Sequence, residues 1–519
     1  MLKTKITPFK NMTYLDFSNP EVKAQMEEAL CKVLADAGKE YPMFINGEKV
    51  YTEGKIKSYN PSRKNEVLGV FQKADEKTAE LAMQSALSAF ETWKKTPPAD
   101  RADYLFRAAA LMKEKRLELD AVMVLEVGKN WLEADADTCE AIDFLEFYAR
   151  QMLEYAKEQP LTPFEGEENH AFYIPLGVGV IIPPWNFPNA ILTGMTSAAI
   201  VTGNTVILKP ASDSPLIGYK VAEIFNELGL PKGVLNFITG PGKVAGNYLV
   251  EHPKTRFISF TGSMEVGIGI YEKAGRVYPG QIWLKRCIVE MGGKDAIIVD
   301  NEADVDSAVE GVTASAYGFQ GQKCSACSRA IVDEKIYDEF IKKLKARVEK
   351  ITVGDVADQK NYMGPVINES SFNKCKEYIE IGTKEAKLLI GGKCDDSLGY
   401  FVEPTVFIDV KPGSRLEQEE IFGPILSVIK ANNYDHALKI ANDTVYGLTG
   451  GVYTKNEEKI QRAIEDFHVG NLYFNRKCTG AMVDVHPFGG FNLSGTDSKA
   501  GSRDYLLLHL QMKAWSRKK

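Results

Sequence analysis

Two cysteines, Cys324 and Cys327, lie three positions apart in the segment GFQGQKCSACSRA, among small and polar residues. A zinc site needs a second such pair or closely spaced histidines, whereas the six histidines are scattered between positions 170 and 509. A redox dithiol is expected near the start of a small domain, and this pair lies deep in a long chain. The segment therefore favours one reactive cysteine, Cys324, beside a small buried neighbour, Cys327.

Cys324 follows a glycine-rich turn and precedes residues that are compatible with a helix. We therefore expect it at a helix N-terminus, where the helix dipole favours the thiolate form of cysteine. A thiolate that attacks a carbonyl group also needs a donor for the oxyanion, a base for water and an acceptor for electrons. The backbone N–H group of Cys324 could itself point at the substrate oxygen.

Asn186 and Glu290 are candidates for the donor and the base. Asn186 stands in the loop after the apolar run GVGVII, where a side-chain amide can reach an oxyanion, although a turn residue is the simpler explanation of its position alone. Glu290 lies among apolar residues before two glycines, which predicts a raised carboxyl pKa, as a general base near neutral pH requires. A salt-bridged or helix-capping glutamate is the alternative explanation.

Two loops after strand-like runs could bind a dinucleotide, which would accept the electrons. The segment FTGS, which ends at Ser263, stands at a strand-to-helix junction, where free N–H groups and the Ser263 hydroxyl suit a pyrophosphate. Lys209, in the segment LKPAS, stands at a strand end, where it could hold a ribose hydroxyl. The GxGxxG fingerprint is absent, so these two loops alone are a weak indication.

The elements that must position these residues are helices and short strands. Residues 76–93, 101–113 and 139–157 carry apolar residues at helical spacing, so the first third is predicted to be mostly helical. Further along, two series of β-rich runs alternate with helical stretches, which predicts two α/β domains with parallel sheets. The apolar segment 504–515 is predicted to be a terminal strand that joins a sheet in this or another subunit.

The composition is that of a soluble globular protein, and 519 residues imply two or three domains. A net charge of −7 with scattered basic residues gives no support to nucleic-acid binding. The N-terminus lacks the apolar core of a signal peptide, and the most apolar run is broken by Pro183 and Pro184 and is too short to span a bilayer. We expect a cytoplasmic protein whose eight cysteines are mostly free thiols.

Seven segments together resemble the aldehyde dehydrogenase superfamily, because PWNF, LKPAS, FTGS, EMGGK, GQKCSA, EEIFGP and PFGG occur in that family's order across essentially the whole chain. The resemblance implies an α/β fold with two Rossmann-like domains and a β-flap for oligomerisation, in a homo-oligomer built from dimers. It implies a NAD-binding domain over 1–155 and 177–287 and a catalytic domain over 288–478. The oligomerisation flap and C-terminal tail would cover 156–176 and 479–519. The flap would be made from a hairpin near 156–176 and the C-terminal tail.

The same resemblance implies a role for each candidate residue. Cys324 would be the nucleophile, Asn186 and the Cys324 N–H group the oxyanion hole, and Glu290 the base that activates water. No metal site is implied. The resemblance implies that NAD is bound by seven residues, Trp185, Lys209, Ser212, Gly262, Ser263, Glu420 and Phe422. NAD-specific members often carry a glutamate at the position of Ser212, so some activity with NADP is also expected here.

Further segments, among them EADADTCEAIDF, FHVGNLYFNR and HPFGGFNLSGTDSKAG, resemble the members of this family that act in proline and arginine catabolism. Those members oxidise L-glutamate 5-semialdehyde, formed from 1-pyrroline-5-carboxylate, to L-glutamate. The resemblance implies that the N–H groups of Gly480 and Ala481 and the hydroxyl of Ser325 bind the substrate carboxylate. It implies that Phe187 and Phe488 flank the aliphatic stem.

Asp484 departs from the family pattern close to this loop, and we expect its carboxylate to point away from the substrate. Two alternative substrates stay open: another amino-acid or dicarboxylic semialdehyde, or aldehydes in general. A CoA-acylating or phosphorylating dehydrogenase is disfavoured by Glu290, because a base that activates water would hydrolyse the thioester. A non-catalytic protein with this fold is disfavoured because every catalytic candidate is present.

Overall fold

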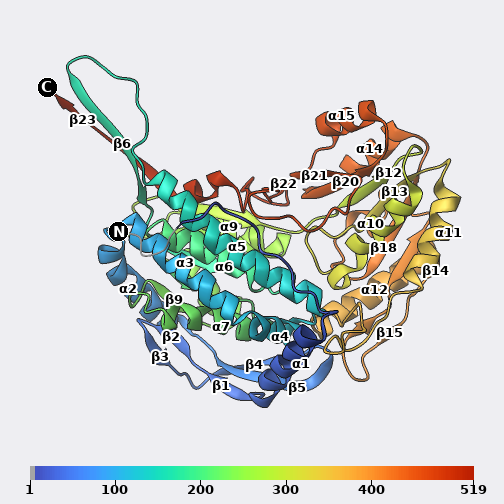
Figure 1. The fold of residues 1–519 in the computed structure, drawn as a ribbon, viewed down its shortest axis with the longest axis horizontal. Coiled ribbons are helices and arrows are strands. Elements are labelled where there is room, and N and C mark those ends of the chain that lie inside the picture. Colours follow the sequence, from blue (N-terminus) through green and yellow to red (C-terminus); the bar gives the residue numbers. More distant parts are fainter. Residues whose placement is uncertain (1–5) are drawn as a thin grey trace.

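Two seven-stranded sheets form the two halves of the structure, a computed structural model that describes residues 6–519 (Figure 1). The first sheet is parallel except at the edge made by β2 and β3, and its order is β11 (Arg286–Glu290), β10 (Thr255–Thr261), β7 (Val178–Ile182), β8 (Thr205–Leu208), β9 (Leu235–Phe237), β2 (Met43–Ile45) and β3 (Glu48–Val50). The alternation of strands and helices predicted this parallel arrangement, which is confirmed.

The second sheet is parallel except at β14, and the picture draws it in yellow and orange. Its order is β14 (Lys387–Ile390), β17 (Thr405–Ile408), β18 (Ile425–Ala431), β13 (Arg329–Asp333), β12 (Ala296–Val299), β20 (Thr449–Tyr453) and β21 (Asn471–Phe474). Since β11 belongs to the first sheet, that sheet reaches Glu290, and the chain crosses to the second sheet directly after it. The division into NAD-binding and catalytic domains stays a prediction.

Helices cover both sheets. Those of the first half are α1 (Pro20–Ala35), α2 (Glu76–Trp93), α3 (Pro98–Glu114), α4 (Arg116–Val127), α5 (Trp131–Tyr155), α6 (Ala190–Val201), α7 (Pro215–Glu227), α8 (Asn247–Glu251) and α9 (Met264–Ala274). Those of the second half are α10 (Val305–Tyr317), α11 (Tyr337–Val348), α12 (Glu369–Glu385), α13 (Arg415–Gln418), α14 (Tyr434–Asn442) and α15 (Glu457–Asp466).

The predicted helix over 76–93 coincides with α2, which begins where the Asp75 carboxylate accepts the N–H group of Thr78. The first third also contains strands that the sequence did not reveal. They form a three-stranded sheet of β1 (Lys39–Tyr41), β5 (Arg63–Gln72) and β4 (Lys55–Asn60). Two small antiparallel pairs are also present, β15 (Cys394–Asp395) with β16 (Phe401–Val402), and β19 (Tyr446–Gly447) with β22 (Phe491–Asn492).

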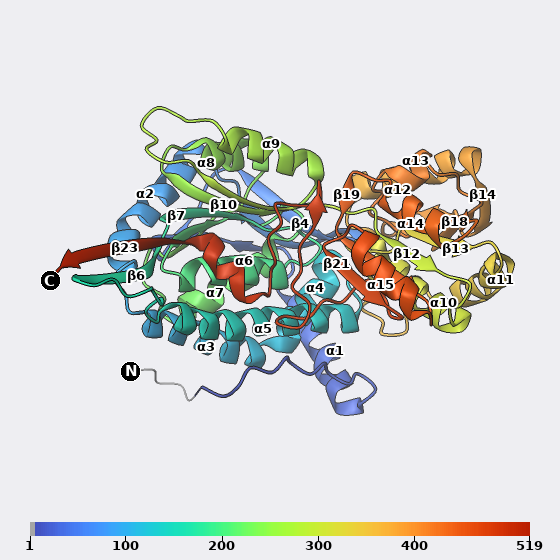
Figure 2. The same ribbon diagram turned by 90° about the horizontal axis from the view of Figure 1, so that it is seen from above.

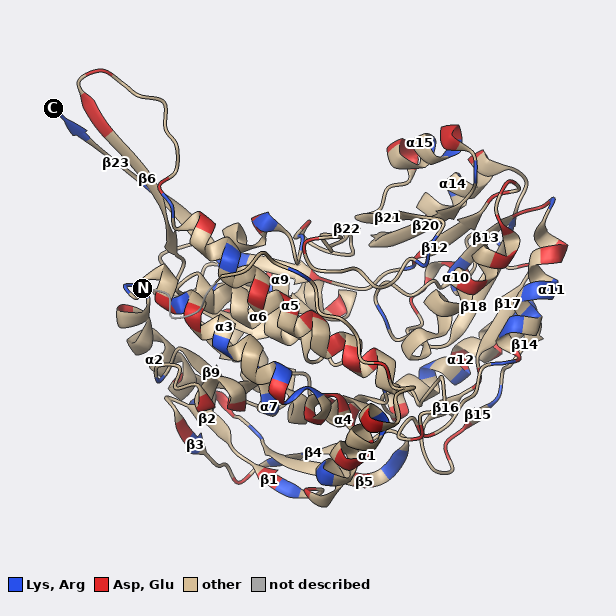
Figure 3. Cartoon of the chain, in the orientation of Figure 1, with Lys and Arg blue, Asp and Glu red and all other residues tan. Residues whose placement is uncertain are grey.

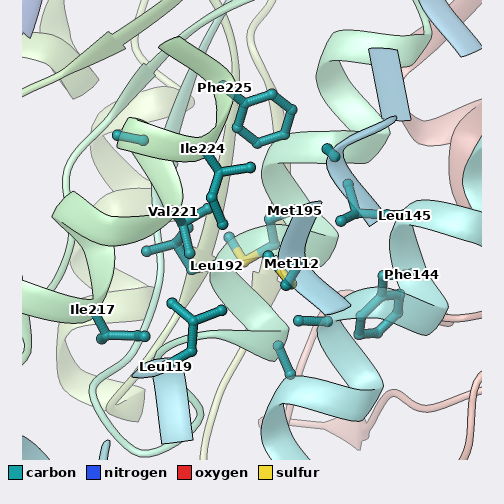
Figure 4. Packing of buried hydrophobic residues seen from close by; sticks show 14 of the residues in the cluster. Met112, Leu119, Phe144, Leu145, Leu192, Met195, Ile217, Val221, Ile224 and Phe225 are labelled. Atoms are coloured by element: carbon teal, nitrogen blue, oxygen red, sulfur yellow. The ribbon is translucent and has the colours of Figure 1, made fainter. Parts of the chain in front are cut away.

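The largest core lies where helices α3 to α7 pack on one another and on the first sheet. One face of α7 contributes four apolar residues at helical spacing, so burying that face explains why the segment folds as a helix. Figure 4 shows these four residues, Ile217, Val221, Ile224 and Phe225, beside side chains from α3 to α6, including Met112, Leu119, Phe144, Leu192 and Met195. This packing fixes α5 and α6, which carry side chains of the candidate site.

The C-terminal segment differs from the prediction in part. Residues Arg503–His509 form a 3-10 helix, and only Leu510–Lys518 forms a strand, β23. β23 pairs antiparallel with β6 (Glu167–Pro175) of the same chain, and the two strands project together from the first half (Figures 1 and 2). The expected hairpin near 156–176 is therefore wrong, because β6 finds its partner at the other end of the chain.

Figure 3 shows Lys and Arg interspersed with Asp and Glu along the helices of both halves. This mixture differs from the basic stripe that follows a nucleic-acid backbone. Between Ile6 and Lys519, none of the helices has the length and the apolar character that crossing a membrane requires.

Candidate active site

One cavity brings together residues from β10 and β11 of the first sheet, from α5 and α6, from the turn before β13 and from the C-terminal segment. It is lined mostly by apolar and aromatic side chains, as cavities for small organic ligands usually are. Seven of the residues predicted to act on the substrate line it: Phe187, Glu290, Cys324, Ser325, Gly480, Ala481 and Phe488. The sequence-based set therefore comes together in space, although its members are spread over some three hundred positions.

Cys324 does not begin a helix, so that expectation is wrong. The segment before it is a short 3-10 turn in which Phe319 and Gln320 have left-handed φ angles of 50° and 57°. The segment after it leads into β13, which lies between β12 and β18 in the middle of the second sheet. Those sheet partners are distant in sequence, so local composition could not distinguish this strand entry from a helix start.

The thiolate form of Cys324 is also not favoured in this structure. Burial raises the pKa of the Cys324 thiol, and the carboxylates of Asp295, Glu420 and Glu290 raise it further. Without a helix dipole to oppose these effects, the thiol keeps its proton at neutral pH. The sulfur therefore needs a proton acceptor when it reacts.

Glu290 ends β11 and faces the same cavity. Its carboxylate accepts hydrogen bonds from the Ser498 hydroxyl and from the Gly490 N–H group, the latter at 3.1 Å. Burial outweighs these two donors and raises the pKa of the Glu290 carboxyl to about 8. The predicted direction of the shift is confirmed, and the carboxyl can exchange a proton near neutral pH.

Asn186 lies in the loop between β7 and α6, as expected, and is 4% exposed. Its Nδ2 atom donates to the backbone carbonyl of Gln322 at 3.0 Å, which ties the amide to the turn before Cys324. An amide nitrogen carries two hydrogens, so one remains for another acceptor. Cys327, in contrast, is buried and its Sγ atom lies 3.4 Å from the carbonyl of Arg329, in agreement with the structural role predicted for it.

The Gly480–Ala481 loop lies at another side of the cavity. Gly480 has a φ of 77°, a left-handed conformation that glycine adopts without strain. The Nη2 atom of Arg476 donates to the Thr479 carbonyl at 2.8 Å and so holds the loop from outside. Asp484 lies outside the cavity lining and faces Arg503, with 3.8 Å between Oδ1 and Nε, so its expected outward orientation is confirmed.

The residues expected to hold a dinucleotide lie at strand ends of the first sheet and beside the turn of Cys324. Burial lowers the pKa of the Lys209 ammonium group to about 8, and its Nζ atom donates to the carbonyls of Pro210 and Gly240 at 3.0 and 3.2 Å. Ser212 is exposed, and its hydroxyl lies 3.5 Å from the same Gly240 carbonyl. Ser263 caps α9, where its hydroxyl accepts the Val266 N–H group at 3.4 Å.

Gly262 connects β10 to this cap. Glu420 and Phe422 lie in the loop before β18, and the rings of Phe422 and Trp185 meet edge to face at 5.5 Å. The Glu420 Oε1 atom accepts the Gly293 N–H group at 3.0 Å, and a side chain at Gly292 would collide with this carboxylate.

Sequence reasoning missed Glu140, which lines the cavity from α5. Burial and the nearby Asp137 raise the pKa of the Glu140 carboxyl to about 8. The segment EADADTCEAIDF contains several acidic residues, and the sequence alone did not indicate which of them faces the cavity. Among residues 6–519, no group of three His, Cys, Asp or Glu side chains is placed to hold a metal ion.

Residues 49–515 match the Aldehyde dehydrogenase family, and the chain belongs to that family. It is 57% identical over 511 residues to the 1-pyrroline-5-carboxylate dehydrogenase of Geobacillus sp. strain WCH70, with 98% of this chain and 99% of that protein covered. It is 55% identical over 503 residues to the protein of the same name from Bacillus subtilis strain 168, with 97% and 98% covered.

Solved structures of aldehyde dehydrogenases are also similar to this chain. The chain superposes on 1-pyrroline-5-carboxylate dehydrogenase from Thermus with bound NAD at a TM-score of 0.98 and 52% identity, covering 99% of this chain and 100% of that one. Betaine aldehyde dehydrogenase from Staphylococcus aureus in complex with NAD+ superposes at a TM-score of 0.88 and 30% identity, with 95% and 97% covered. The predicted family and its α/β fold are therefore confirmed.

Proposed function

We propose that the chain oxidises L-glutamate 5-semialdehyde, the open form of 1-pyrroline-5-carboxylate, to L-glutamate with NAD, in the breakdown of proline and arginine. The observation that carries the proposal is the cavity itself, which has a nucleophile and a base on one side and the Gly480–Ala481 loop on another. The N–H groups of this loop have no hydrogen-bond acceptor within residues 6–519. The relatives named 1-pyrroline-5-carboxylate dehydrogenase, matched over nearly their full length, support the same substrate.

The reacting residues are Cys324, Asn186 and Glu290. The Cys324 sulfur bonds to the aldehyde carbon as the thiol proton passes to solvent, which gives a thiohemiacetal. Its oxyanion is held by the remaining hydrogen of the Asn186 amide and by the Cys324 N–H group. When bound, NAD supplies the acceptor for the hydride that leaves this carbon.

A thioester on Cys324 then remains to be hydrolysed. Glu290 releases its proton to solvent and takes one from water, and the resulting hydroxide attacks the thioester carbon while Asn186 again holds the oxyanion. The carbon–sulfur bond breaks, L-glutamate leaves, and Cys324 regains a proton.

The substrate lies across the cavity from Cys324 to the glycine loop. The N–H groups of Gly480 and Ala481 and the Ser325 hydroxyl bind the α-carboxylate, while Phe187 and Phe488 pack against the methylene groups. We add Glu140 as the partner of the substrate ammonium group, because its carboxyl lines this cavity and a cation bound there would offset the cost of burying its charge.

Residues of the candidate cofactor site fit a dinucleotide. The Lys209 ammonium group has one hydrogen left to donate to a ribose hydroxyl. The start of α9, after Gly262 and Ser263, presents N–H groups for a pyrophosphate. Ser212 carries no charge that would repel the 2′-phosphate of NADP. Glu420, with Oε2 left over, would hold the second ribose, and the Trp185–Phe422 pair would flank the nicotinamide. The proposal includes the NAD-binding domain over 1–155 and 177–287 and the catalytic domain over 288–478.

A homo-oligomer built from dimers completes the proposal. Large apolar side chains are exposed beyond α9, where Val277, Ile282 and Leu284 are 63%, 81% and 74% exposed, and on the projecting β23, where Trp515 is 40% exposed. Contiguous apolar side chains of this kind usually mark a contact with another subunit. The eight free cysteines suit the reducing cytoplasm, where we place the enzyme.

A steady-state panel of aldehydes with NAD and with NADP tests the proposal. Glutamate semialdehyde should show a kcat/KM at least about tenfold above that of pentanal, because a neutral aldehyde leaves the carboxylate-binding groups unpaired at about 1–3 kcal/mol per group. Free acid should form without CoA or phosphate, which separates hydrolysis from acyl transfer. Equal kcat/KM values for pentanal and glutamate semialdehyde would leave a general aldehyde dehydrogenase, and a higher value for another semialdehyde would reassign the substrate.

A further inference from the structure

The segment before α1 is an extended arm that runs along α5 (Figures 1 and 2). Backbone groups of the arm bond to side chains of α5 and α4 at intervals. The Leu15 N–H group donates to the Asp135 carboxylate at 2.8 Å, the Met12 N–H group donates to the Asp143 carboxylate at 2.9 Å, and the Thr7 carbonyl accepts from Arg150 at 3.1 Å. These bonds fix the path of the arm over the helix.

Asn11 lies at the centre of this path and joins three segments. Its Nδ2 atom donates to the second carboxylate oxygen of Asp143 at 3.0 Å and to the backbone carbonyl of Val483 at 3.0 Å. The second bond connects residues 472 positions apart. Within residues 6–519, Asn11 is the only donor to the Val483 carbonyl.

Val483 is 3% exposed and lines the cavity directly after Gly480, Ala481 and Met482. On its other side, the Asp484 N–H group donates to the Gly501 carbonyl at 2.8 Å. The Asn11 bond therefore fixes the peptide that leaves the carboxylate-binding loop. Because Val483 lies only three positions after Gly480, a shift at this carbonyl changes the direction of the N–H groups that face the cavity.

Helix α5 couples the two sides of this contact. Asp143 accepts hydrogen bonds from the Asn11 side chain and from the Met12 N–H group. The next residue, Phe144, lines the cavity. One turn further along, the Tyr148 hydroxyl accepts the Gly501 N–H group at 2.9 Å and also lines the cavity. The arm thus contacts a helix and a loop that both belong to the wall of the substrate site.

The arm lies outside the part of the chain that matches the Aldehyde dehydrogenase family, which begins at residue 49. The relatives named 1-pyrroline-5-carboxylate dehydrogenase match over 98% or 97% of this chain, which leaves room for no more than a short unmatched end. The match to the Geobacillus relative, over 511 of 519 residues, therefore extends into the arm, which the matched family segment does not include.

We propose that Asn11 is a positioning residue for the carboxylate-binding loop, so that the N-terminal arm contributes to the preference for aldehydes that carry an α-carboxylate. The inference rests on the proposed function. Asn11 does not touch the substrate, and it acts through the Val483 carbonyl on the loop that does. A neutral aldehyde makes no use of this loop and should not sense the arm.

The test compares Asn11→Ala with Lys10→Ala. Lys10 is the neighbouring residue on the arm, is exposed, and forms no hydrogen bond or ion pair within the described chain. The full-length enzymes are assayed with saturating NAD on glutamate semialdehyde and on pentanal, and thermal unfolding is recorded for each. Asn11→Asp, which keeps the size but places a carboxylate against Asp143 and the Val483 carbonyl, is the second variant.

Asn11→Ala should raise the KM for glutamate semialdehyde about fivefold with kcat within about twofold of wild type, since the hydrogen bond that holds the Val483 carbonyl is lost. Asn11→Asp should raise this KM further, while both variants keep the wild-type kcat/KM for pentanal and Lys10→Ala keeps every parameter. An unchanged KM in both Asn11 variants would overturn the inference. A parallel loss on both aldehydes, with or without lower thermal stability, would also overturn it, because the arm would then be a general structural support. A wild-type enzyme without preference for glutamate semialdehyde would instead refute the proposed function.

Discussion

The two ends of the cavity are built in different ways. At the reacting end, Glu290 and Cys324 are positioned by strands of the two sheets, one at the end of β11 and the other before β13. At the binding end, the Gly480–Ala481 loop belongs to no sheet and is held by side chains from elsewhere, namely Arg476 and Asn11. The reacting end lies wholly within the segment that matches the family, whereas the binding end depends on a residue before it.

This difference implies that one end of the cavity is suited to the shared chemistry and the other to substrate selectivity. A geometry set by sheet backbone is suited to chemistry that every member of the family performs, because the backbone bonds persist when surface residues change. A geometry set by a few side chains can be altered by single substitutions, which suits selectivity. Changes at the reacting end should therefore affect all substrates alike, and changes at the binding sites should affect only some.

The largest effect is expected for Cys324→Ser, which should lower kcat about 10³-fold or more for glutamate semialdehyde and pentanal alike, because a hydroxyl is a far weaker nucleophile. Binding of NAD, followed by fluorescence titration, should be retained. The control is Cys327→Ser, in which the new hydroxyl can donate to the Arg329 carbonyl that the thiol now contacts. If both variants lose activity to the same extent, the two cysteines act together and the single-nucleophile interpretation is wrong.

Glu290→Gln should slow hydrolysis of the thioester by about 10²-fold or more and leave hydride transfer faster than turnover. Rapid mixing with NAD and glutamate semialdehyde should then show a burst of NADH followed by a slow phase. In the wild type, hydrolysis should increase as the pH rises through about 8, because the base must be ionised and its pKa lies there. The glutamine variant should lose this dependence.

Ser498→Ala sharpens the same experiment. The Ser498 hydroxyl donates to the Glu290 carboxylate and stabilises its ionised form. Its removal should move the midpoint of the pH profile upward and leave the plateau rate at high pH nearly unchanged. A uniform loss in Glu290→Gln with no burst would show that the carboxyl acts before hydrolysis or only supports the fold.

The smallest and most selective effect is expected for Ser212→Glu. The wild type should turn over NADP measurably, since a neutral hydroxyl near Lys209 does not repel a 2′-phosphate. The glutamate should lower kcat/KM for NADP by about tenfold or more and keep kcat/KM for NAD within about twofold. Steady-state assays of both proteins with both cofactors measure this. Absence of NADP turnover in the wild type would mean that another residue sets the choice.

The regular elements that the sequence did predict have local signals. The helix over 76–93 is amphipathic along its whole length, and the strand at 178–182 is a short apolar run between turns, so each pattern could be interpreted by itself. The candidate catalytic residues could also be named, since the motifs that contain them occur in the family's order. Direct comparison confirms the family and the fold, while the roles of the individual residues stay predictions.

What the sequence did not reveal depends on distant partners. The turn at Cys324 leads into a strand whose place is set by β12 and β18, and not into a helix. The predicted C-terminal strand has its partner in β6, and the position of Asn11 depends on a carbonyl 472 residues away. Glu140 was overlooked for a related reason, because the direction in which a helix residue points is set by the neighbours of the helix. Each of these features is determined by tertiary contacts that have no local signature.

The pairing of β6 with β23 has a consequence for synthesis. The two strands are in register from Leu510 opposite Pro175 to Lys518 opposite Glu167, and Arg517 pairs with Glu168 across 349 positions. At about 5–20 residues per second, β6 leaves the ribosome on the order of 20–70 seconds before its partner exists. During that interval β6 presents an open edge to other nascent chains. A polysome, where copies emerge side by side, is therefore where this protein is most exposed to mispairing, and any stall before Leu510 prolongs that exposure.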